Sequence, residues 1–265
     1  MDLQIKDRVA LITGATDGMG FETARILAAE GCKLVLSDKE ITRLEKDAAS
    51  LDADYICVAA DVTDQAAVDA MARQALDRFG RIDIVLHTAG ITGAKGHPLE
   101  VADADYLEAW EIDFMSAVRV ARATFPTMRA NGWGRFVCIT SENAVQPYWD
   151  EATYNTAKAA LAAFVKNLSY KEAEHGILCN TVSPAFIETQ MTDGMMEKRS
   201  KELGVSFEEA VESFLEEERP GIALKRRGRA EEVAAAIALI VSERGSFING
   251  SNMRVDGGSV QAVQN

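Results

Sequence analysis

A tyrosine and a lysine four residues apart are the residues of this sequence most clearly suited to chemistry. They are Tyr154 and Lys158, and Ser141 precedes the tyrosine by thirteen residues. Residues four apart share one face of a helix, so we expect the Lys158 ammonium to lower the phenol pKa from its usual value of about 10. Such a phenol can exchange a proton with a carbonyl or alcohol oxygen, and the Ser141 hydroxyl would donate a second hydrogen bond to that oxygen. Tyr-x-x-x-Lys alone is also typical of an ordinary helix surface, but its combination with the serine and a glycine-rich turn favours catalysis.

The glycine-rich turn follows the first predicted strand. Gly14, Gly18 and Gly20 have the spacing Gly-x-x-x-Gly-x-Gly. The first would permit a tight turn, the second would let the backbone approach a pyrophosphate, and the third would let the next helix pack closely on the sheet. The N-terminus of that helix offers free N–H groups and a positive dipole to phosphates. The turn therefore predicts a dinucleotide site.

An acidic residue at the end of the second predicted strand bears on the choice of cofactor. Asp38 is placed to accept hydrogen bonds from the adenosine ribose hydroxyls and would repel a 2′-phosphate. We therefore expect NAD, with NADP the weaker ligand. Lys39 follows directly and would soften that repulsion. The alternative for Asp38 is a turn residue after a strand.

The composition excludes several classes of partner. The chain has 265 residues, of which 48% are hydrophobic and 26% charged, as in an ordinary globular protein. Its formal net charge of −13 argues against nucleic acid, whose phosphates need a basic surface, and against an anionic membrane. The N-terminus lacks the apolar core of a signal peptide, and no apolar run is long enough to span a bilayer. We therefore expect a cytoplasmic protein that acts on a small molecule.

Cysteine and histidine show no metal-binding pattern. The four cysteines contain no Cys-x-x-Cys pair, and the three histidines are far apart, so we expect no metal site. Cys57, Cys138 and Cys179 lie in apolar runs, which predicts buried free thiols in a reducing compartment.

Short apolar runs alternate with longer helix-like stretches along the chain. Such runs mark a parallel sheet covered by helices on both faces. No linker or repeat interrupts the pattern, so we expect one domain over residues 1–265, an α/β doubly wound Rossmann-type fold with a parallel central sheet. The predicted strands are residues 9–12, 34–36, 55–58, 82–86, 136–139 and 177–182.

The longest departure from this pattern is the segment 190–224, after the sixth predicted strand. It is rich in Met and Glu, and Ser206 with Glu209 has the spacing of a capping box at the start of a helix. Ligands of open α/β sheets bind beyond the carboxyl ends of the strands. We therefore predict a lid over the substrate, the alternative being an extra pair of surface helices.

Together these residues resemble the short-chain dehydrogenase/reductase family in its single-domain branch, over nearly the whole chain. The resemblance implies seven strands, a homotetramer or dimer, and a Ser-Tyr-Lys catalytic set at Ser141, Tyr154 and Lys158. It implies that Asp61 contacts the adenine, and that the Ile187 backbone and the Thr189 hydroxyl hold the nicotinamide amide. The cofactor-binding residues so implied are Thr13, Gly14, Thr16, Asp17, Gly18, Met19, Gly20, Asp38, Asp61, Val62, Ala89, Gly90, Tyr154, Lys158, Pro184, Ile187 and Thr189.

The sequence departs from the family pattern at three places. His87 and Thr88 replace two asparagines before Ala89, and we expect His87 to be a packing or hydrogen-bonding residue at a strand end. Asp113 stands where the family has a catalytic asparagine that holds a water linking the lysine to solvent; a buried carboxylate there would pair with or perturb Lys158. Ala185 replaces the usual glycine after Pro184, which would alter that loop slightly.

These features predict an NAD-dependent oxidoreductase, of the alcohol dehydrogenase type, that transfers a hydride between nicotinamide and a secondary alcohol or ketone. One alternative is an NADP-dependent ketone or 3-oxoacyl reductase of the same family; another is a non-catalytic dinucleotide-binding sensor or scaffold. The aromatic and methionine residues of the predicted pocket suggest an apolar substrate, whereas Glu142 and Asn143 would suit a polar group. The pocket candidates are Glu142, Asn143, Gln146, Tyr148, Trp149, Phe186, Met191 and Met195.

Overall fold

The computed structural model describes residues 1–263, which build a seven-stranded sheet with every neighbouring pair of strands parallel. The strand order is β3-β2-β1-β4-β5-β6-β7. The expected doubly wound, parallel Rossmann-type fold is therefore confirmed. The strands are β1 (Val9–Thr13), β2 (Lys33–Asp38), β3 (Tyr55–Ala59), β4 (Ile84–His87), β5 (Gly134–Ile139), β6 (Ile177–Pro184) and β7 (Asn252–Val255).

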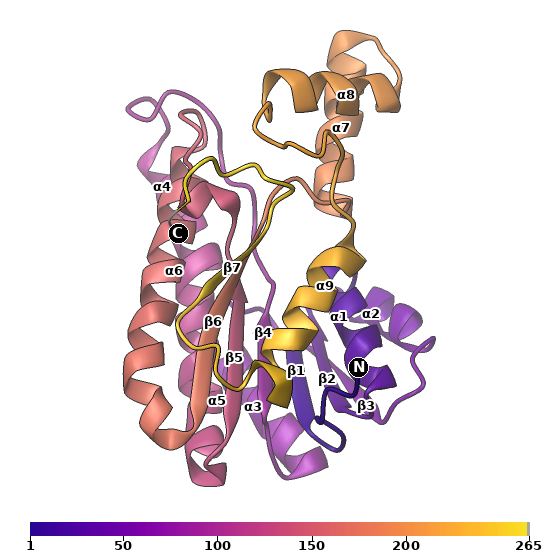
Figure 1. The fold of residues 1–265 in the computed structure, drawn as a ribbon, viewed down its shortest axis with the longest axis vertical. Helices are drawn as coiled ribbons and strands as arrows, with labels where there is room; N and C mark the ends of the chain where they lie inside the picture. The colour runs from indigo at the N-terminus through magenta and orange to yellow at the C-terminus, as the bar shows by residue number, and fades with distance from the viewer. Residues whose placement is uncertain (264–265) are drawn as a thin grey trace.

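Helices cover both faces of the sheet (Figure 1). One face carries α1, α2 and α9, and the other carries α3, α5 and α6. The helices are α1 (Gly18–Ala29), α2 (Ile41–Ala48), α3 (Gln65–Phe79), α4 (Asp103–Trp110), α5 (Ser116–Asn131), α6 (Ala152–Glu172), α7 (Gln190–Leu203), α8 (Phe207–Glu217) and α9 (Ala230–Ile240).

Alternating side chains of β1 explain why the apolar runs of the sequence are continuous. Ala10 and Ile12 belong to the core on the α1 and α9 face, whereas Val9 and Leu11 belong to the core on the α3 and α5 face. Successive residues of a strand point to opposite faces. A strand with both faces covered must therefore be apolar at every position.

The strand order reverses beside β1, which lies between β2 and β4. The chain therefore leaves β1 and β4 toward opposite faces of the sheet, and a cavity lies at this carboxyl edge. Ligands of doubly wound folds bind at such a switch point. All the predicted catalytic and cofactor residues except Asp113 lie on this edge or on the helices that begin there.

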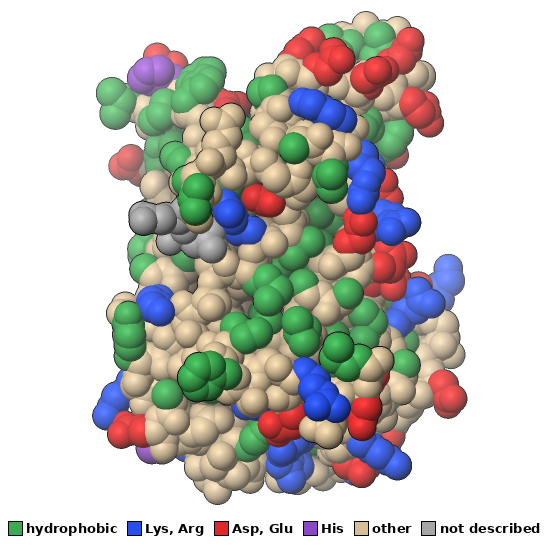
Figure 2. Space-filling view, in the orientation of Figure 1, with side chains coloured by type: hydrophobic (Ala, Val, Ile, Leu, Met, Phe, Trp, Pro, Cys, Tyr) green, Lys and Arg blue, Asp and Glu red, His purple; other side chains and the backbone are tan. Residues whose placement is uncertain are grey.

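Helices α7 and α8 form a lobe that stands above the carboxyl edge of the sheet (Figure 1). The predicted capping box is confirmed, because the side chains of Ser206 and Glu209 each accept a hydrogen bond from the other's backbone N–H. The lobe has a small apolar core that includes Phe186, Met196 and Phe214. Acidic side chains gather on its outer surface (Figure 2). Within residues 1–263, no helix is long and apolar enough to cross a membrane.

Candidate active site

The three predicted catalytic residues come from two neighbouring elements. Ser141 follows β5 and caps a short 3-10 helix, Glu142–Ala144, whose Asn143 N–H donates to the serine hydroxyl. Tyr154 and Lys158 lie one turn apart on α6, and the Lys158 Nζ lies 5.5 Å from the centre of the tyrosine ring. Ser141 and Tyr154 line the same cavity. The structure thus places the three residues together, and their catalytic roles remain predictions.

The pKa of Tyr154 differs from the value expected from the sequence. Burial raises it, and the nearby carboxylate of Asp113 adds to that increase. The Lys158 ammonium and the adjacent Ser141 hydroxyl lower it, as expected. The net pKa is nevertheless above the usual value, because burial disfavours the phenolate more than one ammonium favours it. The expectation of a net lowered pKa was therefore wrong for the protein alone.

Asp113 contacts Lys158 directly, as expected for a buried carboxylate at this position. Its Oδ1 lies 3.1 Å from the Lys158 Nζ and accepts a hydrogen bond from the Ile91 N–H at 3.0 Å. A separation of 3.1 Å leaves no space for a water between the two atoms. Burial lowers the pKa of Lys158, but Asp113 and Tyr154 more than offset this, so the net pKa is raised.

Asp113 lies in a π-helical turn, Glu111–Met115, between α4 and α5. A side chain on Gly90 would clash with the ion pair, because a Cβ there would lie 2.5 Å from Asp113 Oδ1 and 3.1 Å from Lys158 Nζ. Gly90 is therefore needed for the close approach of its loop to the ion pair.

A cavity of about 320 Å³ lies at the switch point, where doubly wound folds bind dinucleotides. Two buried hydroxyls, Thr16 Oγ1 and Ser37 Oγ, have no hydrogen-bond partner within residues 1–263. Gly14 has φ 66°, and a Cβ on it would lie 2.6 Å from Thr88 Oγ1, so the loops after β1 and β4 meet too closely for a side chain. These features fit the predicted cofactor. The predicted residues that line the cavity are Gly14, Asp17, Asp38, Val62, Ala89 and Gly90.

The two acids near the carboxyl ends of β2 and β3, Asp38 and Asp61, differ in whether a cation pairs with them. Asp38 Oδ1 accepts hydrogen bonds from the N–H groups of Lys39 and Glu40, at 2.7 and 3.4 Å, so Asp38 also stabilises its own turn. The Lys39 Nζ pairs with Asp61 Oδ2 at 3.0 Å rather than with Asp38. The pKa of Asp61 is lowered to about 2, mainly by hydrogen bonds from Thr63. Asp38, which is predicted to contact the ribose, thus pairs with no cation within residues 1–263.

The remaining predicted cofactor residues have local partners. Thr13 Oγ1 bonds His87 Nδ1 at 2.8 Å, and His87 Nε2 bonds Ser116 Oγ at 2.8 Å. Burial, and then the charge of Lys158, lowers the pKa of His87 to about 3. The histidine is therefore a neutral bridge between β1 and α5, which agrees with its expected packing role.

Several of these residues join α1 and α7 to the sheet. The Thr189 hydroxyl caps α7 by accepting from the Thr192 N–H, and Gly18 lies against the Thr189 side chain. Gly20 lies against the backbone of Gly14, which explains the need for a glycine there. The Met19 carbonyl accepts a hydrogen bond from the Thr23 hydroxyl, and Asp17 pairs with Arg43. Pro184 ends β6, and the Ile187 carbonyl accepts from the Thr192 hydroxyl.

A second cavity, of about 90 Å³, contains Ser141 and Tyr154 and shares Met191 with the dinucleotide cavity. Five of the predicted pocket residues line it, namely Glu142, Asn143, Phe186, Met191 and Met195. The other three do not. Gln146 bonds the backbone of Ser259, Tyr148 packs under Arg219, and Trp149 is 74% exposed.

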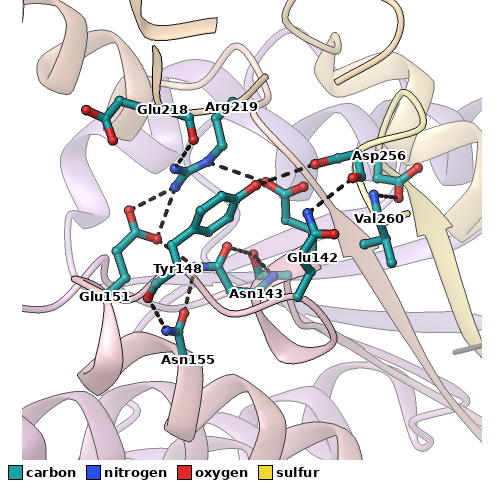
Figure 3. Close-up of polar contacts among 12 residues, drawn as sticks. Glu142, Asn143, Tyr148, Glu151, Asn155, Glu218, Arg219, Asp256 and Val260 are labelled. Atoms are coloured by element: carbon teal, nitrogen blue, oxygen red, sulfur yellow. Dashed lines mark hydrogen bonds and ion pairs between the residues drawn. The ribbon is translucent and has the colours of Figure 1, made fainter. Parts of the chain in front are cut away.

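Three charged residues of this cavity were missed from the sequence. Arg219 follows α8 and donates to both oxygens of Glu151, at 2.8 and 3.0 Å, while Lys95 pairs with Glu151 at 2.5 Å. Figure 3 shows Arg219 reaching down to Glu151 with its guanidinium over the ring of Tyr148. Glu151 precedes Tyr154 by three residues at the start of α6. The position of Glu151 near Tyr154 was the one signal in the sequence that could have identified it as a site residue. Its partners, Lys95 and Arg219, lie 56 and 68 residues away along the chain.

Ser141, the predicted catalytic serine, belongs to the same hydrogen-bond network. Ser141 Oγ donates to Asn143 Oδ1 at 3.0 Å, and Asn143 Nδ2 donates to Glu151 Oε2 at 2.6 Å and to Asn155 Oδ1 at 2.8 Å. A chain of hydrogen bonds therefore runs from Arg219 through Glu151 and Asn143 to Ser141. Figure 3 shows Arg219, Glu151 and Asn143 of this chain. Within the described part of the chain, no group of three or more His, Cys, Asp or Glu residues is placed to hold a metal ion.

Comparisons with known proteins identify the family of this chain. A family model described as enoyl-(acyl carrier protein) reductase, within the short-chain dehydrogenase/reductases, matches residues 14–260. The chain therefore belongs to the short-chain dehydrogenase/reductase family. It is an oxidoreductase that acts on CH–OH groups with a nicotinamide dinucleotide.

Three relatives illustrate the likeness. The chain is 31% identical to levodione reductase of Leifsonia aquatica, covering 97% of this chain and 95% of the relative. It is 33% identical to meso-2,3-butanediol dehydrogenase of Serratia marcescens, covering 97% and 96%. The crystal structure of L-sorbose reductase from Gluconobacter frateurii, complexed with NADPH and L-sorbose, is 34% identical and superposes with a TM-score of 0.93, over 99% of this chain and all of that one.

Proposed function

We propose that the enzyme interconverts a small secondary alcohol and its ketone, with NAD as the preferred cofactor. The observation that carries this proposal is the placement of Ser141 and Tyr154 in a cavity that shares a wall residue, Met191, with the dinucleotide cavity. The named substrates of the relatives, a dione, a diol and a ketose, support a carbonyl or alcohol substrate.

The bound dinucleotide would donate or accept the hydride. Tyr154 would donate its proton to the carbonyl oxygen in reduction and remove the hydroxyl proton in oxidation. Ser141 would donate a hydrogen bond to the same oxygen, after its hydroxyl turns from Asn143. Lys158 bonds Asp113 and the Ile139 carbonyl, the latter at 3.2 Å. Its third N–H is left for the nicotinamide ribose, while its charge favours the phenolate.

Asp38 supports the preference for NAD. Its carboxylate lies in the dinucleotide cavity, and the nearest ammonium, that of Lys39, is engaged by Asp61. A 2′-phosphate would therefore meet a carboxylate without a compensating cation. The NADP-dependent reductase remains the rival, supported by the NADPH complex of the sorbose reductase.

The test is a panel of secondary alcohols and ketones assayed with NAD, NADP and their reduced forms by nicotinamide absorbance. We expect turnover of at least one alcohol–ketone pair, with the larger kcat/KM for NAD or NADH. Binding of dinucleotide without turnover of any pair would favour the sensor or scaffold. A larger kcat/KM with NADPH would favour the rival reductase.

Three further features of the enzyme are inferred with this function: its oligomeric state, its cellular compartment and a substrate lid. We infer one domain, a cytoplasmic homotetramer or dimer, and a substrate lid over residues 190–224. The exposed apolar side chains of Leu107 and Trp110 on α4 support self-association, and the four free cysteines support a reducing compartment. Light scattering of the purified enzyme tests the assembly.

A further inference from the structure

The cavity that holds Ser141 and Tyr154 is lined by two cations and two carboxylates. These four residues are Lys95, Glu142, Glu151 and Arg219, which we call the charged cluster. Their formal charges cancel. Such a cluster beside a catalytic tyrosine is not needed to bind a plain hydrocarbon chain, because burying charges costs free energy unless they are paired and used.

Every charge of the cluster already has an opposite partner. Lys95 pairs with Glu151 at 2.5 Å, and Arg219 lies 2.8 Å from Glu151 and 3.5 Å from Glu142. An anionic substrate would find no unpaired cation, and an amine would find no unpaired carboxylate. The cluster therefore favours a neutral ligand.

Hydrogen-bonding capacity remains free on both sides of the cluster. Lys95 uses one of its three N–H groups on Glu151, and Thr92, another lining residue, makes no side-chain hydrogen bond within residues 1–263. Glu142 accepts from Tyr148 through Oε1 and lies beside the Ser259 hydroxyl. Its buried Oε2 has no partner of ordinary hydrogen-bond geometry among the described residues. Donors and an acceptor are thus available together. A hydroxyl group, which is both donor and acceptor, matches this set, whereas a methylene matches none of it.

The size of the cavity limits the rest of the substrate. Its volume of about 90 Å³ is smaller than the apolar cavity of about 150 Å³ that admits benzene. Phe186, Met195 and Phe214 supply an apolar wall. A short carbon chain with a polar group near the reacting carbon fits these surroundings.

We propose that the charged cluster binds a neutral hydroxyl group on the carbon adjacent to the reacting one, so that the substrates are small vicinal diols or polyols and the matching hydroxyketones. This inference rests on the proposed alcohol–ketone oxidoreductase activity. It adds a specificity site, in which Lys95 donates to the second hydroxyl and Glu142 accepts from it.

Three ketones with one carbon skeleton test the inference: 1-hydroxy-2-butanone, 2-butanone and 2-oxobutanoate. Each reduction consumes a hydride from the reduced dinucleotide and one proton, and yields the alcohol and the oxidised dinucleotide. We expect kcat/KM for the hydroxyketone to exceed that for 2-butanone by at least about tenfold, since a site built to bond a hydroxyl rejects the analogue without it. The kcat/KM for 2-oxobutanoate should be lower than that for 2-butanone.

The failures of the two proposals are distinguishable. Equal values for 1-hydroxy-2-butanone and 2-butanone would overturn the hydroxyl site and leave the oxidoreductase proposal standing. A preference for 2-oxobutanoate would overturn the charge-balance argument. Absence of turnover with any alcohol or ketone, with either cofactor, would overturn the proposed function and this inference with it.

Two variants address the cluster directly. Lys95→Met should reduce the ratio of hydroxyketone to ketone activity by at least about tenfold, because it removes the free donors. Glu142→Gln should raise the relative activity toward 2-oxobutanoate, because it leaves one cation in excess. Lys198→Met is the matched control, since Lys198 is 78% exposed on α7 and pairs with Glu202 outside the cavity. An unchanged ratio in Lys95→Met, or an equal fall in the control, would overturn the assignment.

A binding measurement that needs no turnover completes the test. With the reduced dinucleotide present, an alcohol cannot transfer a hydride, so calorimetric titration reports binding alone. We expect 1,2-butanediol to bind at least about tenfold more tightly than 2-butanol, and Lys95→Met to narrow the difference. Equal binding of the two alcohols to the unmodified enzyme would refute the site.

Discussion

The carboxylate of Asp113 neutralises the buried ammonium of Lys158 at a distance of 3.1 Å. The same carboxylate raises the pKa of Tyr154, which the ammonium lowers. Asp113 therefore opposes the ionisation of Tyr154 while it keeps Lys158 protonated. These opposite effects give the ion pair a role in setting the pH at which the Tyr154 phenol ionises.

Asp113→Asn should shift the pH profile of alcohol oxidation to lower pH, with activity retained. Removal of the negative charge lowers the pKa of Tyr154, so the phenolate needed for oxidation appears at lower pH. The pKa of Lys158 also falls, so the decline at high pH should begin earlier. The measurement is kcat/KM against pH. Asp77→Asn, an exposed change on α3, is the control; a shift of the Asp113 variant to higher pH would refute the electrostatic argument.

Tyr154→Phe should keep dinucleotide binding and lose most turnover. The change removes the proton donor and keeps the ring, and general acid–base groups typically contribute about 10²–10⁴-fold. Calorimetric titration with NAD checks binding, and nicotinamide absorbance checks turnover. Near-normal turnover on a substrate of the unmodified enzyme would require another acid.

Asp38→Ala should reduce the ratio of the affinity for NAD to the affinity for NADP. In the unmodified enzyme we expect NAD to bind more tightly than NADP by at least about tenfold, or about 1.4 kcal/mol. The variant removes the repulsion of the 2′-phosphate and some of the ribose hydrogen bonding. Calorimetric titrations of the unmodified enzyme and of Asp38→Ala with NAD and with NADP give the four dissociation constants. Tighter binding of NADP to the unmodified protein would contradict the proposed preference.

Arg219→Met should destabilise the protein more than Arg199→Met. Arg219 contacts two buried carboxylates, and loss of one partner from buried pairs costs about 3–5 kcal/mol. Arg199 pairs with Glu217, which is 64% exposed, and exposed pairs contribute about 0–1 kcal/mol. Urea unfolding measures both free energies. Equal decreases in the free energy of unfolding would show that the ion pairs of Arg219 stabilise the protein no more than the exposed pair of Arg199 does.

Hydrogen exchange tests the lid. The backbone amides of residues 190–224 should exchange faster without ligands than with dinucleotide and substrate together, because lids close to exclude water. Amides of β1 serve as the internal reference. Equal protection of residues 190–224 in both states would favour the alternative of surface helices.

The sequence predicts those features that depend on local pattern. The glycines of residues 13–20, the apolar strands and the pairing of Tyr154 with Lys158 each follow from spacing alone. β7, which is only partly buried, has no such pattern, and the family resemblance supplied it.

Features that depend on distant contacts were not predictable in this way. The pKa of Tyr154 depends on how deeply the phenol is buried, which spacing does not report. Lys95 and Arg219 meet at Glu151 through contacts between residues 56 and 68 apart, and no local signal marks either cation as part of the site.

Because Asp113 lies in the π-helical turn at Glu111–Met115, its position depends on the number of residues in that turn. Such a turn contains one residue more than the regular helix on either side. Deleting one residue from it would let α4 and α5 join as one continuous helix, with a change of about 100° in the direction of the side chains on one side. Asp113 would then turn away from Lys158 although no active-site residue had been replaced. Single-residue insertions and deletions in this turn are thus a way to alter the ionisation of the active site that substitutions alone do not offer.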